Sequence, residues 1–393
     1  MKKYYLWLTM IFGCSNDALT ELFNRFETAE EIYNAFRSNI AAAGYKYAEK
    51  AEETPLEAAE KLLSEIEGKG ITVITIDDEL YPKGLRFIPN PPRLLFVKGN
   101  AALLKEKLLT VAGSRRITNY TIAAETAVCE SLCEEYTLVS SLCDGCEQLA
   151  CLTAINCGKG CVEILPCGLD QTYPKGSQLL RQKILMSGGC IVSEFLPDVK
   201  ANNTNFLRRA RISGGISKAM LIFQAGIKSG SLNAAKYSPA LFFLPPNNIF
   251  SPEYAAAVQY VRNGASLYYG KEDLENAFSE GFSPKKEITI PPSEKVQPEK
   301  NTRENPEPKE EKTKNKKALS ENKMPSEELF ESPLHYKVYR RIASAEQPIT
   351  FDEIFRNEEI DISDLNEILL DLEISDMISA APGSRYIAKN QSS

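Results

Sequence analysis

The chain has 393 residues, a formal net charge of −7, 43% hydrophobic residues and 25% charged residues. This length predicts two or three domains, and this composition is ordinary for a folded protein. The overall acidity argues against a generic polyanion binder, whose signature is a basic domain. The single histidine, His335, excludes a metal site built from several histidines.

The N-terminal stretch, residues 1–17, has a basic start and an apolar run. Two tyrosines and a threonine interrupt the run and no small-residue cleavage site follows it, which argues against a signal peptide. No run of about 20 apolar residues predicts a membrane span. We therefore expect a cytoplasmic protein whose ten cysteines are reduced thiols. The CxxC pair Cys143 and Cys146 lacks the second pair that a structural zinc site needs. Small buried side chains are the favoured interpretation there, with metal or redox chemistry as the lesser alternative.

Residues 1–68 are predicted to be helical, because apolar residues recur at helical spacing in 18–26, 29–36 and 55–66. Short helices around the turn Phe12-Gly13-Cys14 resemble a SAM-like or helix-hairpin-helix module. Such modules can bind DNA phosphates through turn amides. Because this turn carries no basic residue, a packing or interaction domain is the favoured interpretation.

Residues 70–278 alternate short apolar runs with helical patterns. The predicted strands lie in 71–76, 108–113, 136–141, 161–166, 190–195, 219–224 and 240–245, and the predicted helices in 118–134, 147–157, 177–188 and 254–262. This alternation predicts an α/β domain with a Rossmann-like, doubly wound, mostly parallel sheet. Ligands of such a sheet bind beyond the carboxyl ends of the strands, so the turns that follow strands matter most.

Residues 279–327 are predicted to be a disordered linker, since they combine many prolines and charges with few apolar residues. Residues 328–390 regain periodicity. A helix is predicted to start at Ser332-Pro333, Thr350 and Glu353 form a capping box for a second, and a third covers 363–372. A hairpin with Pro382-Gly383 at its turn follows, which suggests a winged helix. Acidic residues outnumber basic ones in this module, so a protein partner is favoured over nucleic acid.

Positive charge gathers in the predicted α/β domain although the chain is acidic. Residues 199–252 contain no acidic residue, and they hold the basic residues Lys200, Arg208, Arg209, Arg211, Lys218, Lys228 and Lys236. Residues 80–124 hold one acid, Glu106, against eight basic residues. A cationic surface with few nearby acids is typical of an anion or polynucleotide site.

Small and basic residues recur in the turns that follow the predicted strands. Glycine lets an anion approach the backbone closely, serine supplies a hydroxyl, and arginine supplies a charged fork. The turns, in order, are Gly113-Ser114-Arg115, Val139–Glu147, Gly168–Pro174, Val192–Glu194, Phe206–Ser217 and Ser229–Ala235. The order of these motifs resembles the DNA-processing protein A (DprA/Smf) family, and the likeness covers residues 70–278.

The resemblance implies a protein that binds single-stranded DNA, protects incoming strands and helps load the RecA recombinase during natural transformation, as a homodimer and without a cofactor or catalytic residue. It assigns the strand-binding arginines and lysine to Arg115, Lys175, Arg209 and Arg211. Backbone and hydroxyl contacts to phosphate fall to Gly113, Ser114, Ser229, Gly230 and Ser231.

Several positions depart from the family pattern. Ser141 replaces a glycine, Glu147 an aspartate, Ala210 an asparagine, Gln224 an acid and Ala234 a threonine. Two other functions therefore stay open: a nucleotide-binding or protein-interaction scaffold that has lost strand binding, and a nucleotide phosphoribohydrolase of the lysine-decarboxylase-like type. The enzyme is disfavoured, because glycosidic cleavage needs a carboxylate near the anomeric carbon and residues 199–252 supply none.

Overall fold

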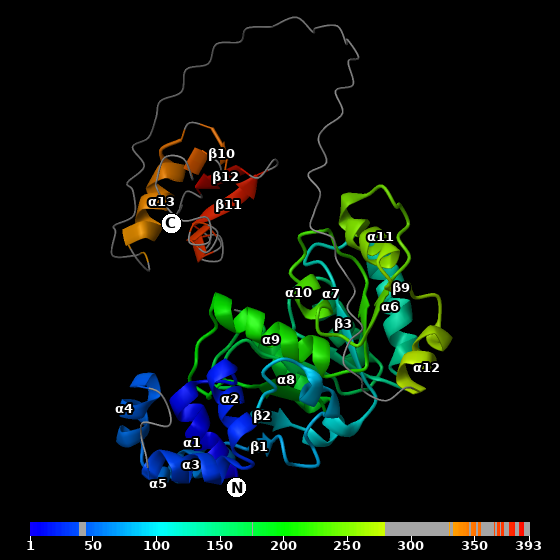
Figure 1. The fold of residues 1–393 in the computed structure, drawn as a ribbon. Coiled ribbons are helices and arrows are strands. Elements are labelled where there is room, and N and C mark those ends of the chain that lie inside the picture. The colour runs from blue at the N-terminus through cyan, green and yellow to red at the C-terminus, as the bar shows by residue number, and fades with distance from the viewer. Residues whose placement is uncertain are drawn as a thin grey trace, which may run out of the picture. The chain divides into compact units, whose positions relative to one another are not determined.

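The computed structural model describes residues 1–38, 45–174 and 176–279 and, nearer the C-terminus, shorter stretches between residues 330 and 388. The chain divides into two compact units, Met1–Glu294 and Lys295–Ser393. Each unit is described by itself below (Figure 1).

The first unit begins with helices, as predicted. They are α1 (Lys2–Phe12), α2 (Asp17–Arg25), α3 (Ala29–Ser38), α4 (Tyr45–Glu53) and α5 (Leu56–Gly68). Helix α1 lies in the predicted helical region, residues 1–68, but outside the three stretches in which apolar residues recur at helical spacing. Its residues Tyr5 through Thr9 are all buried, so the helix lacks the one-sided apolar stripe by which a surface helix is recognised.

A nine-stranded sheet follows in the order β1-β2-β6-β5-β4-β3-β7-β8-β9. The strands from β6 to β9 are parallel, which confirms the mostly parallel, doubly wound sheet. Strand β1 pairs antiparallel with β2, and β2 pairs antiparallel with β6. The strands are β1 (Ile71–Thr75), β2 (Leu94–Gly99), β3 (Leu108–Ala112), β4 (Thr137–Ser140), β5 (Val162–Ile164), β6 (Cys190–Ser193), β7 (Ala219–Ile222), β8 (Ala240–Phe243) and β9 (Ser266–Leu267).

Helices cover both faces of this sheet. They are α6 (Asn119–Leu132), α7 (Cys146–Asn156), α8 (Gln178–Met186), α9 (Asn203–Gly215), α10 (Leu232–Ala235), α11 (Ala255–Arg262) and α12 (Lys271–Ser279), with 3-10 turns η2 (Lys83–Phe87), η3 (Ala101–Lys105) and η4 (Pro252–Tyr254). Alternate residues of β3 face opposite sides, since Leu109 and Val111 pack with residues of α6, α7 and α8 while Ala112 packs with those of α10 and α11.

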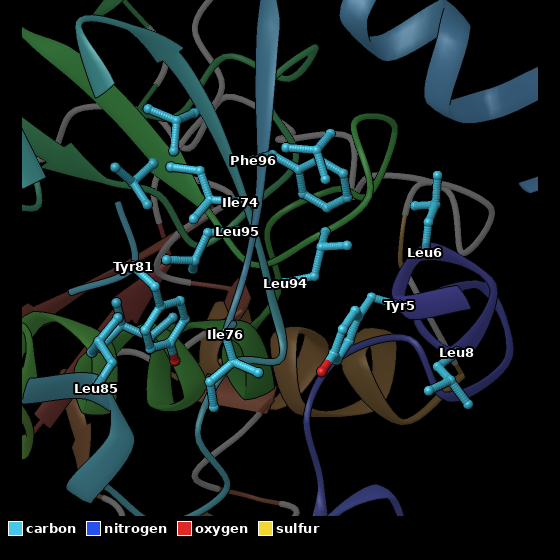
Figure 2. Close-up of a cluster of buried hydrophobic side chains, with 14 of the residues drawn as sticks. Tyr5, Leu6, Leu8, Ile74, Ile76, Tyr81, Leu85, Leu94, Leu95 and Phe96 are labelled. Atoms are coloured by element: carbon cyan, nitrogen blue, oxygen red, sulfur yellow. The ribbon is translucent and has the colours of Figure 1, made fainter. Parts of the chain in front are cut away.

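The N-terminal helices share a hydrophobic core with the antiparallel edge of the sheet. Tyr5 and Leu6 of α1 belong to the same buried cluster as Ile74 of β1 and Phe96 of β2 (Figure 2). Trp7 is fully buried, and its Nε1 donates to the carbonyl oxygen of Thr54 at 2.7 Å. The helices therefore pack against β1 and β2 as part of the first unit.

The strand order reverses between β3 and β7. From β3 the chain proceeds outward through β4, β5 and β6, then returns to the other side of β3 with β7 and continues to β8 and β9. Such a reversal opens a crevice beyond the carboxyl ends of the two strands, and ligands of doubly wound sheets bind there. The turns after β3 and β7 contain the predicted Gly113 and Ser229 motifs.

The second unit contains α13 (Pro333–Ala343) and a three-stranded antiparallel sheet, β10 (Ile349–Thr350), β11 (Ile378–Ala381) and β12 (Arg385–Ala388), in the order β10-β12-β11. The hairpin of β11 and β12 is as predicted. Its Pro382-Gly383 turn lies outside the described residues, as do Ser332, most of the predicted linker and half of the predicted third helix. The capping box is formed, since Thr350 N donates to Glu353 Oε2 at 2.8 Å and Glu353 N donates to Thr350 Oγ1 at 3.3 Å.

Within the described ranges, no helix combines the length and the hydropathy that crossing a membrane would require. In the same ranges, no three side chains of the metal-ligating types are grouped so that they could hold an ion.

Candidate nucleic-acid interface

The turn after β3 is held against its neighbours by backbone contacts. Ser114 N donates to the carbonyl oxygen of Gln224, at the end of β7, at 2.7 Å, and the carbonyl oxygen of Ser114 accepts from Cys146 N at 3.2 Å. A Cβ at position 113 would lie 2.2 Å from Cys146 Sγ, so this position requires glycine for packing. The side chains of Arg115 and Arg116, which follow, are exposed. The turn thus presents two guanidinium groups on a fixed backbone.

Gln224, which stands where the family pattern has an acid, organises this turn. Its side chain is buried, and its Oε1 accepts from Thr118 N at 3.0 Å and from Thr121 Oγ1 at 2.8 Å. Its Nε2 donates to the carbonyl oxygen of Arg116 at 3.0 Å. One amide therefore connects the segment after β7 to Arg116, which lies before the N-cap of α6, and to the N-cap and first turn of α6. Being neutral, this amide adds no negative charge beside the two arginines.

The turn after β4 packs directly on the first turn. Gly145 has φ +82°, and a Cβ there would lie 2.2 Å from the carbonyl oxygen of Ser114, so glycine is required at this position. Buried Glu147 closes the turn from within, because its Oε2 accepts from the backbone N–H groups of Ser141 and Cys143 at 3.2 and 3.3 Å. Glu147 therefore has a structural partner for its charge.

Arg209 of α9 reaches the turn after β4. Its Nη1 lies 3.4 Å from the carbonyl oxygen of Ser141 and 3.9 Å from Cys143 Sγ, and its guanidinium lies over the ring of Phe206. Its Nε is buried without a hydrogen-bond partner in the part of the chain that the structure describes. Burial raises the pKa of Cys143 to about 11, while the charges of Arg209 and Arg115 act to lower it, so both guanidinium groups act on this thiol. The two arginines thus face the same turn.

The turn after β5 brings an aromatic ring to the same place. Tyr173 packs edge-on against Phe206 of α9, with ring centroids 5.0 Å apart. Burial raises the pKa of Tyr173, and the charges of Arg115 and Arg209 oppose that rise. Lys175, predicted from the sequence for this turn, lies outside the described residues.

Arg211 faces the other way from Arg209. It is 6% exposed, and its Nη2 lies 2.5 Å from Oε1 of Glu194, which is also buried. The neighbouring Arg208 donates to Cys14 Sγ. Successive residues of a helix point about 100° apart, so three arginines within four residues cannot share one face. The structure thus gives Arg211 a buried partner, and we leave it out of the proposed DNA contacts.

The turn after β7 follows its strand as predicted, and the strand order places it at the reversal. Ser229 Oγ and Ser231 Oγ are 2.8 Å apart and hydrogen-bonded to each other, and Gly230 between them is exposed. A Cβ at Gly230 would meet no atom within 4 Å, so this glycine leaves open space above the backbone. Lys228, directly before the turn, is exposed.

These contacts bring together Arg115, Arg209, Tyr173 and the backbone of Gly113 and Ser114 at the carboxyl ends of the parallel strands. Residues 72–279 match the family described as DNA recombination-mediator protein A. The chain belongs to this family. The matched residues comprise the sheet, the helices on both of its faces and every turn described in this subsection. The N-terminal helices and the C-terminal unit lie outside the match.

Individual relatives extend this similarity. The chain is 26% identical to "Protein Smf" of Synechocystis over 98% of both chains, and 32% identical to "Protein Smf" of Escherichia coli over 56% of this chain and 61% of that protein. The X-ray structure of DNA processing protein A from Streptococcus pneumoniae superposes with a TM-score of 0.54 and 25% identity, over 61% of this chain and 86% of that chain. The order of small turn motifs is the signal by which the sequence revealed the family.

Two functional candidates escaped the sequence reasoning. Arg116 is exposed beside Arg115 and was not assigned a contact, although its type and position gave the signal. Gln224 was noted as a departure from the family pattern. Its bonds to Thr118, Thr121 and Arg116 could not be inferred from residue order, because they join elements about 100 residues apart.

Proposed function

We propose that this protein binds single-stranded DNA along the carboxyl edge of its sheet, through the phosphates, and acts in DNA recombination by protecting strands and helping to load a RecA-type recombinase. The observation that carries the proposal is the convergence of Arg115 and Arg209 on one turn, with a buried, unpartnered Nε on Arg209. A buried donor without a partner is costly, and a phosphate oxygen would satisfy it.

The surrounding residues support strand binding over enzymatic chemistry. Four carboxylates outside residues 199–252 could serve a phosphoribohydrolase, namely Asp144, Glu147, Asp170 and Glu194, and three of them have structural partners. Glu194 binds Arg211, Glu147 closes the turn after β4, and Asp170 accepts from Lys69 Nζ at 2.6 Å. Asp144 is exposed beside the arginines, and one exposed carboxylate does not supply the acid and base pair of glycosidic cleavage.

The test is equilibrium binding of a labelled 20-nucleotide oligothymidine at fixed salt. We expect Arg115→Ala to weaken binding about tenfold, because a charge-assisted contact to phosphate is lost. Arg262→Ala is the matched control. Arg262 is an exposed arginine in the last turn of α11, which leads back to the amino ends of the strands, away from the proposed site. Equal loss in both variants would contradict the proposed position of the strand. Release of free base from nucleoside monophosphates would instead favour the enzyme.

The recombinase partner, the homodimer, a cytoplasmic location and the winged-helix protein contact are part of the same proposal. Their support is membership of a DNA recombination-mediator family and the acidic composition of the second unit. Filament assembly by a purified RecA-type recombinase on single-stranded DNA, with and without this protein, tests the first. Sedimentation of the full chain tests the second. A chain that sediments as a monomer and leaves filament assembly unchanged would contradict both.

A further inference from the structure

Two large apolar side chains are exposed to solvent in the loop that follows β8, at the carboxyl ends of the strands where we propose that DNA binds. Phe250 is 88% exposed and Ile249 is 59% exposed, both in the loop between β8 and α11. A full phenyl ring in water costs free energy that burial would recover, and an exposed apolar pair therefore marks a contact surface when it adjoins a binding site. The charge of the neighbouring residues indicates which kind of partner covers Phe250 and Ile249.

The loop is fixed at both ends to residues that adjoin the turns at the strand reversal. At its start, the Tyr120 hydroxyl of α6 donates to the carbonyl oxygen of Pro245 at 2.7 Å. At its end, the Tyr254 hydroxyl lies 2.7 Å from Thr118 Oγ1, and Ala256 N donates to the carbonyl oxygen of Ala225 at 3.1 Å. The loop that carries Phe250 is thus anchored to the start of α6, which follows the Arg115 turn, and to Ala225, which precedes the Ser229 turn.

Bonds inside the loop hold its backbone in place. Asn248 Oδ1 accepts from Phe250 N at 3.0 Å, and the carbonyl oxygen of Asn248 accepts from Ser251 N at 3.1 Å. The Ser251 hydroxyl donates to Glu253, the acid that ends the acid-free stretch of residues 199–252. The phenyl ring is therefore presented on an ordered loop, and little conformational entropy remains to be lost when a flat partner covers it.

The charge next to this loop selects the partner. The exposed charged side chains of the turns after β3 and β7 are Arg115, Arg116 and Lys228, all basic, and the acid of the loop itself, Glu253, accepts from the Ser251 hydroxyl. A partner that offers both negative charge and flat apolar faces is a single strand of DNA, whose phosphates and unpaired bases alternate. A protein surface with an apolar patch would have to bring several acidic residues to the same place.

We propose that Phe250 is a stacking platform for a base of the bound single strand, with Ile249 beside it. This inference rests on the proposed function and deepens it, because it assigns the bases, rather than the phosphates, to a second element of the interface. Base stacking on an aromatic ring is tolerant of sequence and independent of charge. It also needs an unpaired base, which makes the loop a source of preference for single over double strands.

The test compares two labelled ligands of equal charge, a 20-nucleotide oligothymidine and an abasic oligodeoxyribose phosphate of the same length, across a salt series. We expect Phe250→Ala to weaken oligothymidine binding about fivefold or more, by loss of one stacked base. It should leave abasic binding and the slope of log K against log salt unchanged. Phe250→Leu should bind like Phe250→Ala, since it keeps an apolar side chain without a ring. Met186→Ala is the control, because Met186 is equally exposed at the end of α8, at the opposite edge of the sheet.

Phe250→Trp gives an independent signal. The natural chain has one tryptophan, Trp7, which is fully buried and would not contact the DNA. Quenching on binding would therefore report a base stacked on the new indole. Unchanged oligothymidine affinity in Phe250→Ala, with wild-type binding intact, would overturn the stacking role and leave the proposed function standing. Equal losses for both ligands would also overturn it. Failure of the wild type to bind either ligand would overturn the proposed function, and the stacking role with it.

Discussion

Glu194 and Arg211 form a buried ion pair in which Oε1 and Nη2 are 2.5 Å apart. The same carboxylate oxygen accepts from Ser15 N at 3.0 Å, so the pair also joins the turn after α1 to α9. The neighbouring Arg208 contacts Cys14 in that turn. The Phe12-Gly13-Cys14 turn is therefore packed against α9.

Arg211→Ala should destabilise the fold, because it leaves the carboxylate of Glu194 buried without its partner. Breaking a buried pair in this way costs about 3–5 kcal/mol of unfolding free energy. Urea denaturation of the first unit measures the loss. The combined change Glu194→Gln with Arg211→Met should recover most of it, since the amide oxygen still accepts from Ser15 N and no charge is buried. A double variant as unstable as Arg211→Ala would refute this explanation.

Arg209→Ala should have the opposite profile, although it lies two residues away on the same helix. We expect weaker binding of single-stranded DNA by about tenfold and a change of unfolding free energy below about 1 kcal/mol, because this guanidinium has weak protein partners. Binding and denaturation measured on the same preparation separate the two effects. A large loss of stability with unchanged affinity would assign Arg209 a structural role.

Gln224→Ala should loosen the turn that carries Arg115 and Arg116. Gln224 itself is buried and is not a proposed DNA contact. It removes the acceptor for Thr118 N and Thr121 Oγ1 and the donor to the carbonyl oxygen of Arg116. We expect a loss of about 1–3 kcal/mol in unfolding free energy, from the buried groups left unpaired, and weaker DNA binding as Arg116 loses its fixed position. Thr126→Ala on the exposed face of α6 is the control. Unchanged affinity in a destabilised variant would show that the turn keeps its shape without the amide.

Glu125→Gln should change how stability depends on pH. Glu125 is fully buried next to Cys146, and burial raises its pKa to about 8. Because this pKa exceeds that of an unfolded glutamate, the native state binds more protons between about pH 4.5 and 8, and stability falls as pH rises through this window. The difference in unfolding free energy between variant and wild type should therefore grow in favour of Gln by about 3 kcal/mol from pH 5 to pH 8. A difference that is constant across this range would contradict the assignment.

The sequence predicted the sheet well and the site in part, and the differences have physical causes. Seven apolar runs mark strands of the sheet, but an apolar run does not encode direction, so β1 was not foreseen as antiparallel. Its connection to β2 contains η2 rather than the long helix that a parallel crossover needs. Within the site, Arg209 and Arg211 look alike in sequence. Helix geometry sends one to the sheet edge and the other to Glu194, and only packing decides which.

The most direct test of strand binding at the carboxyl edge is the salt dependence of oligothymidine binding, for the wild type and for Arg115→Ala combined with Arg209→Ala. Each phosphate contact to a single strand contributes about −0.7 to the slope of log K against log salt. The double variant should therefore have a slope smaller in magnitude by about 1.4, with a duplex competitor displacing little of the wild type's bound strand. An unchanged slope in the double variant, or equal competition by duplex DNA, would contradict the account.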